Sequence, residues 1–67
     1  MDKERAERYI GKKVFIRTNF YKNFTIDVTD VTDDHIIGTD LYGEYSEIGF
    51  NDISTIVPVF ERNKRWT

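Results

Sequence analysis

The chain has 67 residues, the size of one small domain. It contains no cysteine, which excludes disulfides and thiolate metal sites, and its 39% hydrophobic and 15% aromatic content excludes disorder for the middle of the chain. No apolar run reaches membrane-spanning length and no signal-peptide stretch opens the sequence, so we expect a cytoplasmic protein that does not contact membranes.

The net charge of −2 is unevenly distributed along the chain. Residues 1–22 contain seven Lys/Arg and three Asp/Glu, whereas residues 23–60 contain eight Asp/Glu and no Lys/Arg. Residues 61–67 are basic again, with three Lys/Arg and one Glu. If the two basic ends meet on one face, that face attracts an anionic partner. The alternative is a mixed-charge surface that only keeps the protein in solution.

A short helix is predicted at the N-terminus, from Asp2, a suitable N-cap, to Ile10. Gly11 is a suitable residue to end it. Ala6, Tyr9 and Ile10 fall at helical spacing and form one apolar stripe. Because a helix of this length is unstable alone, we expect it to dock on the rest of the fold through that stripe.

From Lys13 the hydrophobic period changes to two, which predicts a first strand up to Phe20 and, after a short turn, a second strand from Phe24. Val31 breaks the alternation of the second strand because it lies three residues after Val28. A bulge between the two valines would return Val31 to the core. It would also bend the strand strongly, as closure of a small barrel requires.

Three further strands are predicted over residues 35–41, 45–50 and 53–60, separated by short turns. Gly38, in the first of them, marks a close backbone approach or a kink. The last is rich in β-branched residues but contains Pro58, which cannot donate a ladder hydrogen bond. That strand is therefore predicted at an edge of the sheet, where its apolar residues must be covered or paired, either within a barrel or with another copy.

These elements predict a mainly β fold, because five short strands are too few for a sandwich. Residues 1–60 are expected to form one domain, a short N-terminal helix followed by a five-stranded, strongly bent small β-barrel. Residues 61–67 are expected to be a basic, flexible tail. A domain of this size buries only about 60% of its unfolded surface, so a well-packed barrel or an oligomer is needed for stability.

Two stretches resemble the Sm-like family, which includes the bacterial RNA chaperone Hfq. Ile53-Ser-Thr-Ile-Val-Pro58 is similar to the Ile-Ser-Thr-Val-Val-Pro ending of the Hfq barrel, and Asp33-Asp34-His35 is similar to the Asp-x-His of many Sm loops. In strand pattern the resemblance covers residues 2–60. It implies an Sm-like barrel whose fourth strand pairs with the fifth strand of the next copy, giving a ring that binds RNA.

The chain departs from this family at the positions that contact RNA. The Lys-His pair of Hfq falls on Phe50 and Asn51. The aromatic residue that stacks on uracil falls near Asp34, whose carboxylate repels phosphate, and the glycine of the second strand falls on Ile26 or Asp27. The resemblance therefore supports the ring geometry more than the uridine pocket.

Candidate nucleic-acid contacts combine cations, polar groups and aromatic rings. They are His35, Phe50, Asn51, Arg62, Lys64, Arg65 and Trp66. In the tail, the cations suit phosphates and the indole suits a stacked base, and the alternative is an ordinary polar tail. His35 could contact a base at the rim of the pore, and the alternative is a strand-end residue that touches Asp33 or Asp34.

The oligomer interface is predicted on the last two strands. Its residues are Tyr45, Ile48, Ile53, Thr55 and Val57. Tyr21, Tyr42 and Tyr45 lie near turns and are interpreted as core edges or interface residues rather than as platforms for bases.

No catalytic site, cofactor or metal is predicted. One histidine, no cysteine and no Gly-rich phosphate loop leave no triad and no phosphate cradle. Ser46 and Ser54 lie outside any nucleophile elbow. Asp30, Asp33 and Asp34 do not match a calcium loop, so we interpret them as solvated turn residues.

Two functions stay open from the sequence. The first is a non-catalytic, ring-forming homo-oligomer that binds single-stranded RNA through stacked bases and basic residues. The alternative is a small protein-binding barrel, phage-derived or regulatory, that uses an edge strand or a charged face and does not bind nucleic acid. The acidic middle of the chain favours the second, because an acidic rim repels nucleic acid and attracts a basic protein segment.

Overall fold

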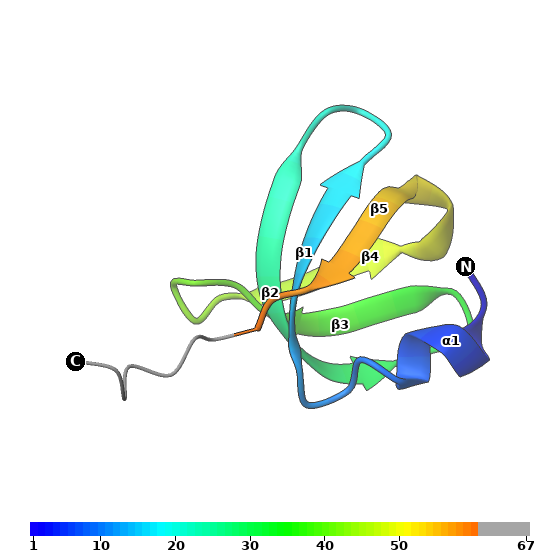
Figure 1. The fold of residues 1–67 in the computed structure, drawn as a ribbon, viewed down its shortest axis with the longest axis horizontal. Helices are drawn as coiled ribbons and strands as arrows, with labels where there is room; N and C mark the ends of the chain where they lie inside the picture. The colour runs from blue at the N-terminus through cyan, green and yellow to red at the C-terminus, as the bar shows by residue number, and fades with distance from the viewer. Residues whose placement is uncertain (61–67) are drawn as a thin grey trace.

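The computed structural model describes residues 1–60, which form a short helix and a five-stranded sheet (Figure 1). In chain order the elements are α1 (Lys3–Glu7), β1 (Lys13–Thr18), β2 (Asn23–Val31), β3 (His35–Thr39), β4 (Tyr45–Gly49), the 3₁₀ turn η1 (Phe50–Asp52) and β5 (Ile53–Pro58). The prediction of a mainly β fold with a short N-terminal helix is confirmed. The predicted tail, residues 61–67, lies outside the described residues.

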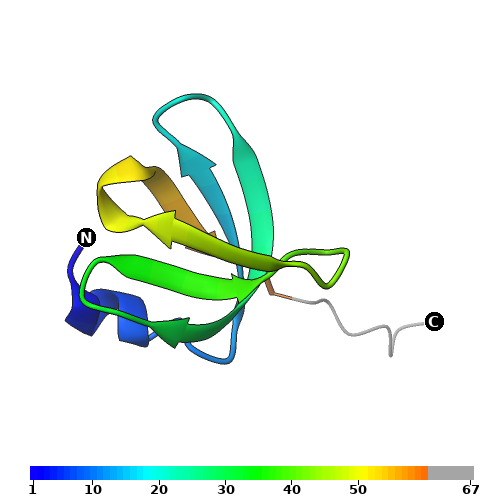
Figure 2. The ribbon, with the colours of Figure 1, turned by 180° about the vertical axis from the view of Figure 1, so that it is seen from behind.

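The strands form one antiparallel sheet in the order β4-β3-β2-β1-β5. β4 and β5 are its two edges, and within residues 1–60 they do not pair with each other, so the sheet is open. Seen from behind, β4 (yellow) follows one edge of the curved sheet, next to β3 (Figure 2). The prediction that the last strand lies at an edge is confirmed, and Pro58 is its final residue.

The bend of the sheet lies in β2, where the pairing register with β3 shifts between Val28 and Asp30. This shift returns Val31 to the buried side, as the broken alternation of the sequence predicted. Gly38 of β3 pairs with Val28 at the same place. A Cβ atom on Gly38 would lie 2.3 Å from the backbone oxygen of Asp27, so the bend requires a glycine there.

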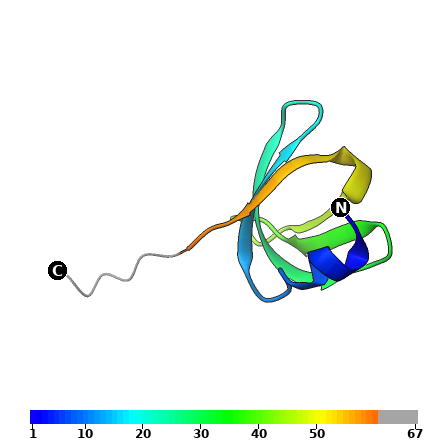
Figure 3. The ribbon, with the colours of Figure 1, turned by 45° about the vertical axis from the view of Figure 1, so that its right-hand side comes forward.

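The core lies on one side of the curved sheet. Its buried apolar residues are Ala6, Val14, Ile16, Ile26, Val28, Val31, Ile36, Ile48 and Phe50. These residues come from α1, from β1 to β4 and from η1. β5 borders the cluster through Ile53 and Ile56, and Tyr9 and Phe24 also pack against it. α1 (blue) lies at one end of the sheet, beside the turn between β2 and β3 (Figure 3).

The helix is shorter than predicted. The Asp2 side chain caps it by accepting a hydrogen bond of 2.9 Å from the backbone N–H of Arg5, but the helix ends at Glu7 rather than Ile10. Gly11 adopts a φ of +85° and donates its N–H to the Val28 carbonyl at 2.8 Å, which directs the chain into the sheet. Ile10 is consequently exposed. Of the predicted apolar stripe, only Ala6 and Tyr9 pack on the core.

Four strands also end earlier than predicted, and β4 does so by one residue, at Gly49, because the η1 turn begins at Phe50. β1 stops at Thr18, whose hydroxyl donates to the Lys22 carbonyl at 3.0 Å and closes a turn in which Phe20 is exposed. β3 stops at Thr39, because Asp40 accepts hydrogen bonds from two backbone N–H groups of the following turn. β5 stops at Pro58, and one further backbone hydrogen bond of 2.9 Å joins the Val59 N–H to the Lys13 carbonyl of β1. Within residues 1–60, no helix is long and apolar enough to cross a membrane.

Candidate functional site

The side of the sheet that faces away from the core, here called the outer face, is set by the alternation of β1. Val14, Ile16 and Thr18 are buried on the core side. Because successive side chains of a strand point to opposite faces, Lys13, Phe15 and Arg17 belong to the outer face. Following the pairing registers, the same face contains Thr25 and Asp27 of β2, Ile37 and Thr39 of β3, Tyr45 and Glu47 of β4, and Thr55 and Val57 of β5.

On β1, the outer face presents an aromatic ring between two cations. Phe15 is half-buried, and its direct neighbours on the adjacent strands are Thr25 and Val57. Its sequence neighbours on the same face are Lys13 and Arg17. Alternation of cations with an aromatic residue suits binding of a single nucleic-acid strand. Both cations belong to the basic residues 1–22, whereas Phe15 was not predicted as a contact, although the alternation that places it is visible in the sequence.

At the opposite edge the outer face is acidic. The Tyr45 hydroxyl donates a hydrogen bond of 2.5 Å to Oε2 of Glu47, two residues along β4. This hydrogen bond is the main cause of a raised pKa for Tyr45, and the negative charge of Asp30 acts in the same direction. The outer face therefore changes from basic near β1 to acidic near β4.

The β5 edge borders a groove. Met1 and Arg5 form one wall, and residues 53–56 of β5 form the other, with a volume of about 330 Å³ between them. Of the predicted interface residues on this strand, Ile53 is half-buried against the core, whereas Thr55 and Val57 are exposed. Their exposure leaves the edge open to a partner strand.

The predicted interface residues of β4 have two different environments. Tyr45 is 66% exposed and is available to a partner. Ile48 is buried in the core of its own chain, so the prediction that its side chain lies at an interface is wrong for the isolated chain. The alternation of β4 separates the two, because residues three apart on a strand face opposite sides.

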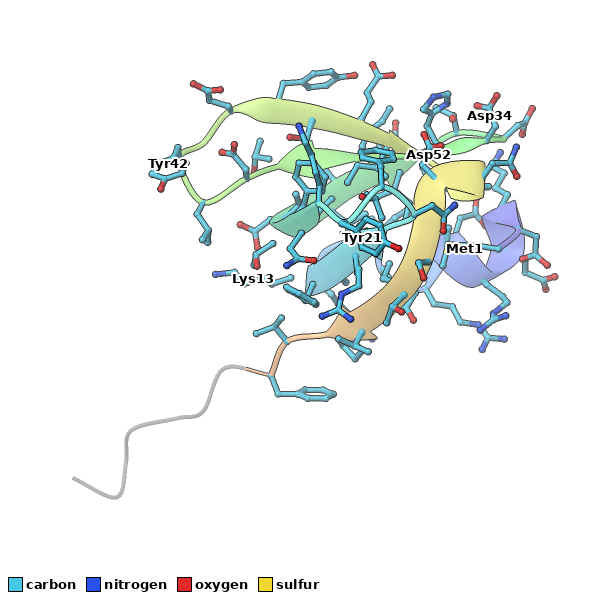
Figure 4. All side chains as sticks on the ribbon, turned by 90° about the horizontal axis from the view of Figure 1, so that it is seen from above. Met1, Lys13, Tyr21, Asp34, Tyr42 and Asp52 are labelled. Atoms are coloured by element: carbon cyan, nitrogen blue, oxygen red, sulfur yellow. The ribbon has the colours of Figure 1, made fainter. Side chains whose placement is uncertain are left out.

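His35 follows the turn between β2 and β3 and contacts Asp34, and Figure 4 shows Asp34 and Asp52 on the same side of the molecule. His35 Nδ1 lies 2.6 Å from Oδ1 of Asp34, so the ring donates to the ionised carboxylate. That hydrogen bond is the main reason why the pKa of Asp34 lies below its ordinary value. A Cβ atom on Gly49 would lie 3.7 Å from His35 Nε2 and 3.4 Å from Oδ2 of Asp52, so the Asp52 carboxylate lies within about 7 Å of the ring. The interpretation of His35 as a strand-end residue that touches Asp34 agrees with this geometry.

Two predicted nucleic-acid contacts sit in the η1 turn. Phe50 is only 8% exposed and belongs to the core, so it cannot stack on a base, and that prediction is wrong. Asn51 is exposed, and its carbonyl accepts a hydrogen bond of 2.8 Å from Nδ2 of Asn19, which ties η1 to the turn after β1. The four remaining candidates, Arg62, Lys64, Arg65 and Trp66, lie outside the described residues.

The tyrosines near turns are not edges of the core. Tyr21 is 91% and Tyr42 is 88% exposed, so their interpretation as core edges is wrong. Tyr42 and the exposed Leu41 border a second groove of about 240 Å³, whose other wall is formed by residues 23–25. Within residues 1–60, no cluster of three or more His, Cys, Asp or Glu side chains could hold a metal ion.

Comparison with known proteins finds no matching protein family, no matching curated protein and no matching solved structure. Two kinds of surface on the described residues can indicate a function. One is an outer face with an aromatic residue between cations, and the other is a pair of open sheet edges that present Tyr45 and Val57.

Proposed function

We propose that the protein is a non-catalytic, Sm-like protein that assembles into a ring of identical copies and binds single-stranded RNA on the outer face. The observation that carries this proposal is the open sheet, whose free edges β4 and β5 expose Tyr45 and Val57. An exposed apolar edge of this kind is a template for pairing with another chain. The short helix, the five strands and the bend in β2 support the proposal, because the Sm-like resemblance was drawn from that pattern.

Pairing of β4 of one copy with β5 of the next would complete a small barrel around each core. Such a contact joins two different surfaces, so repeating it closes a ring when the rotation per copy divides a full turn. It would cover the side chains of Ile53 and Ile56, which are only half-buried in the single chain. Assembly also compensates for the small core of a chain of 67 residues.

The RNA part of the proposal is supported by Phe15 and its two neighbouring cations. The accessible part of the half-buried Phe15 ring can stack on any base, and cations on the same strand can hold the adjacent phosphates. In a ring, every copy repeats this site around one surface, so one RNA strand can contact several sites. The turn with His35 suits RNA less well, because Asp34 contacts the ring, Asp52 lies nearby, and both carboxylates repel phosphate.

Two measurements test the proposal. Light scattering should give a native mass several times the 8.0 kDa of one chain. Fluorescence anisotropy should show binding of U-rich or A-rich single-stranded RNA that weakens between about 50 mM and about 200 mM salt, since phosphate contacts release counterions. A ring that binds no RNA at the lower salt concentration would contradict the RNA part and leave the assembly in place.

A matched pair of variants locates the RNA site. Phe15→Leu keeps an apolar side chain but removes the ring, and we expect RNA affinity to fall about five- to hundredfold, the usual range for one stacked base. Tyr42→Leu removes an equally aromatic side chain from the turn between β3 and β4, and it should leave the affinity within about twofold. If the Tyr42 variant loses as much affinity as the Phe15 variant, the outer face of β1 is not the site.

A protein-binding function is the second candidate, and the acidic surroundings of His35 favour it. Asp33, Asp34 and Asp52 would be repeated around a ring and would attract a basic segment of another protein. A pull-down from lysate separates the two functions. A stoichiometric protein that leaves at high salt supports the second candidate, whereas RNA without such a protein contradicts it.

A further inference from the structure

We propose that the C-terminal segment, residues 61–67, docks on the part of the outer face that spans β2, β3 and β4, with Arg62 and Lys64 against its carboxylates and Trp66 against Tyr45. This part of the sheet face is acidic, and its occupant is the basic segment of the same chain, which follows the described residues. The inference goes beyond the proposed function, because it requires neither RNA nor a ring.

The docking surface, here called the acidic half of the outer face, consists of two rows of paired residues. They are Asp27, Thr39 and Tyr45 in one row and Asp30, Ile37 and Glu47 in the other. All three acids are exposed, and within residues 1–60 neither Asp30 nor Glu47 forms an ion pair. Their negative charges therefore attract a basic segment that can lie across these strands.

An aromatic ring lies among these acids. Tyr45 is 66% exposed, and its hydroxyl donates a hydrogen bond of 2.5 Å to Oε2 of Glu47, which holds the ring along β4. Aromatic rings pack well against one another, and an indole covers more apolar surface than any other side chain. A segment that suits this surface therefore combines cations with an aromatic residue.

The end of β5 delivers the chain to the correct row. The Val59 N–H donates to the Lys13 carbonyl at 2.9 Å, and Lys13 pairs with Asp27, so Val59 begins the row that ends at Tyr45. β4 is four strands from β5, which is about 19 Å at the usual strand spacing. The seven residues from Val59 to Trp66 span at most about 23 Å. The segment is thus just long enough to bring Trp66 to the far edge.

The sequence of the segment alternates in a way that suits one face. In an extended chain, every second side chain points to the same side, so Arg62, Lys64 and Trp66 share one side. Glu61 and Arg65 belong to the other side. The first set contains two cations and the indole without an acid, and it is the set that matches an acidic surface with an exposed ring.

The spacing along the segment also matches the spacing across the sheet. Arg62 is three residues after Val59, about 10 Å in an extended chain, and Asp27 is two strands from β5, also about 10 Å. By the same count, Lys64 falls over β3, between the carboxylates of β2 and β4, and Trp66 falls over β4. Each cation of the set therefore meets a carboxylate.

This path has a consequence for the rest of the outer face. It crosses β1 at Lys13 and leaves Phe15 and Arg17 uncovered, because those two residues lie in other rows. Docked cations also cancel much of the negative charge on the acidic half. If RNA binds at β1 as proposed above, its phosphates then meet less repulsion from the neighbouring strands.

Trp66 is the only tryptophan of the chain, so its fluorescence reports on the segment directly. We expect acrylamide to quench Trp66 in the full chain at least about fourfold less efficiently than in the free peptide of residues 61–67, because a docked indole is covered. This holds at about 50 mM salt, and about 500 mM salt should bring the two values together, because exposed charges are screened. Equal quenching at the lower salt concentration, or protection that salt does not reduce, overturns the proposal.

Two substitutions in the segment test the alternation. Lys64→Glu should raise the quenching to within about 1.5-fold of that of a peptide with the same substitution, because a cation that faces the sheet becomes an acid. Arg65→Glu makes the same charge change on the opposite side, and its quenching should stay within about twofold of the wild type. If the two variants lose protection equally, net charge alone attracts the segment and the proposed path is overturned.

Two substitutions on the sheet test the docking surface. Asp30→Asn/Glu47→Gln should remove the protection of Trp66, whereas Glu4→Gln/Glu7→Gln, the same loss of charge on α1, should leave it within about twofold of the wild type. Circular dichroism checks that both variants fold. Protection that survives the first pair overturns the proposal, as does protection that appears only at concentrations where copies assemble. A protein that stays monomeric and binds no RNA contradicts the proposed function, yet it can still show all the expected quenching results.

Discussion

The two faces of the sheet use the same strands for different purposes. On the core face, the buried apolar residues form one continuous cluster, and within residues 1–60 no buried side-chain polar atom lacks a hydrogen-bond partner. On the outer face, apolar side chains such as Phe15 and Val57 alternate with charged ones and have no layer above them. The core face explains why this short chain folds. The outer face and its open edges explain what the folded chain can contact.

Charge separates the faces as clearly as hydrophobicity does. The core face contains one buried polar residue, Thr18, whose hydroxyl is satisfied by Lys22. The outer face contains cations near β1 and acids near β4. Because charge complementarity steers association and selects partners, the outer face can select a partner without adding to the stability of one copy.

The largest difference between the two faces is expected at Gly38, where the core face has no room for a side chain. We expect Gly38→Val to prevent folding, because a Cβ atom would lie 2.3 Å from the Asp27 backbone oxygen and the backbone cannot move away without undoing the bend. The neighbouring Thr39→Val, on the outer face, should change the free energy of unfolding by less than about 1 kcal/mol. Circular dichroism with heating measures both. A cooperative transition for Gly38→Val near that of the wild type would show that the bend tolerates a side chain.

Two adjacent residues of β1 provide the sharpest test of the difference between the faces. Ile16→Ala should lower the free energy of unfolding by about 2–5 kcal/mol, because Ile16 is fully buried in the core. Phe15→Ala removes a larger side chain from the outer face, yet it should cost less than about 1.5 kcal/mol in a single copy. Urea denaturation at low protein concentration, where assembly is weak, measures both values. Equal losses would mean that the outer face is covered within one chain.

Much of the fold could be predicted because it follows from local patterns. The three-residue step from Val28 to Val31 predicted the bulge, and Pro58 predicted the edge strand, since both reflect constraints on single residues. The helix was predicted too long because spacing alone does not show where a short helix gives way to a tertiary hydrogen bond. Here the bond from the N–H of Gly11 to Val28 determines the end of the turn, and Val28 is far away in sequence.

The candidate site was predicted less well for a physical reason. Phe50 was a candidate RNA contact because it falls on the position of the Lys-His pair in the Sm-like resemblance, but it shares the core side of the chain with Ile48 and is buried. Phe15 was missed because alternation was used to find the buried residues of β1 and not to identify what its other face presents. The side-chain contacts of His35 with Asp34 and its proximity to Asp52 depend on tertiary packing of η1, which no local pattern reveals.

A smaller effect is expected at the helix, which contacts the core face through Ala6 alone among its residues. Asp2→Ala removes the cap on the Arg5 N–H and should lower the free energy of unfolding by about 1 kcal/mol. Asp33→Ala removes only the exposed ion pair of 3.4 Å between Lys3 and Asp33, and it should cost about 0.5 kcal/mol or less. Thermal unfolding of the two variants compares a cap with a surface ion pair. If Asp33→Ala is the more damaging change, the ion pair rather than the cap holds α1 in place.

The smallest expected effect is a pH dependence at the turn between β2 and β3. Since the hydrogen bond from His35 lowers the pKa of Asp34 in the folded chain, Asp34 contributes stability above its unfolded pKa near 3.8, and this contribution is lost as the pH falls through the lower folded value. The difference in melting temperature between the wild type and Asp34→Asn should therefore be small at pH 5 and should shrink below about pH 4. His35→Phe should remove the same pH dependence, because it takes away the donor, and adding Asp34→Asn to it should change nothing further. A difference that stays constant down to pH 3 would mean that protonation of the Asp34 carboxylate does not weaken the turn.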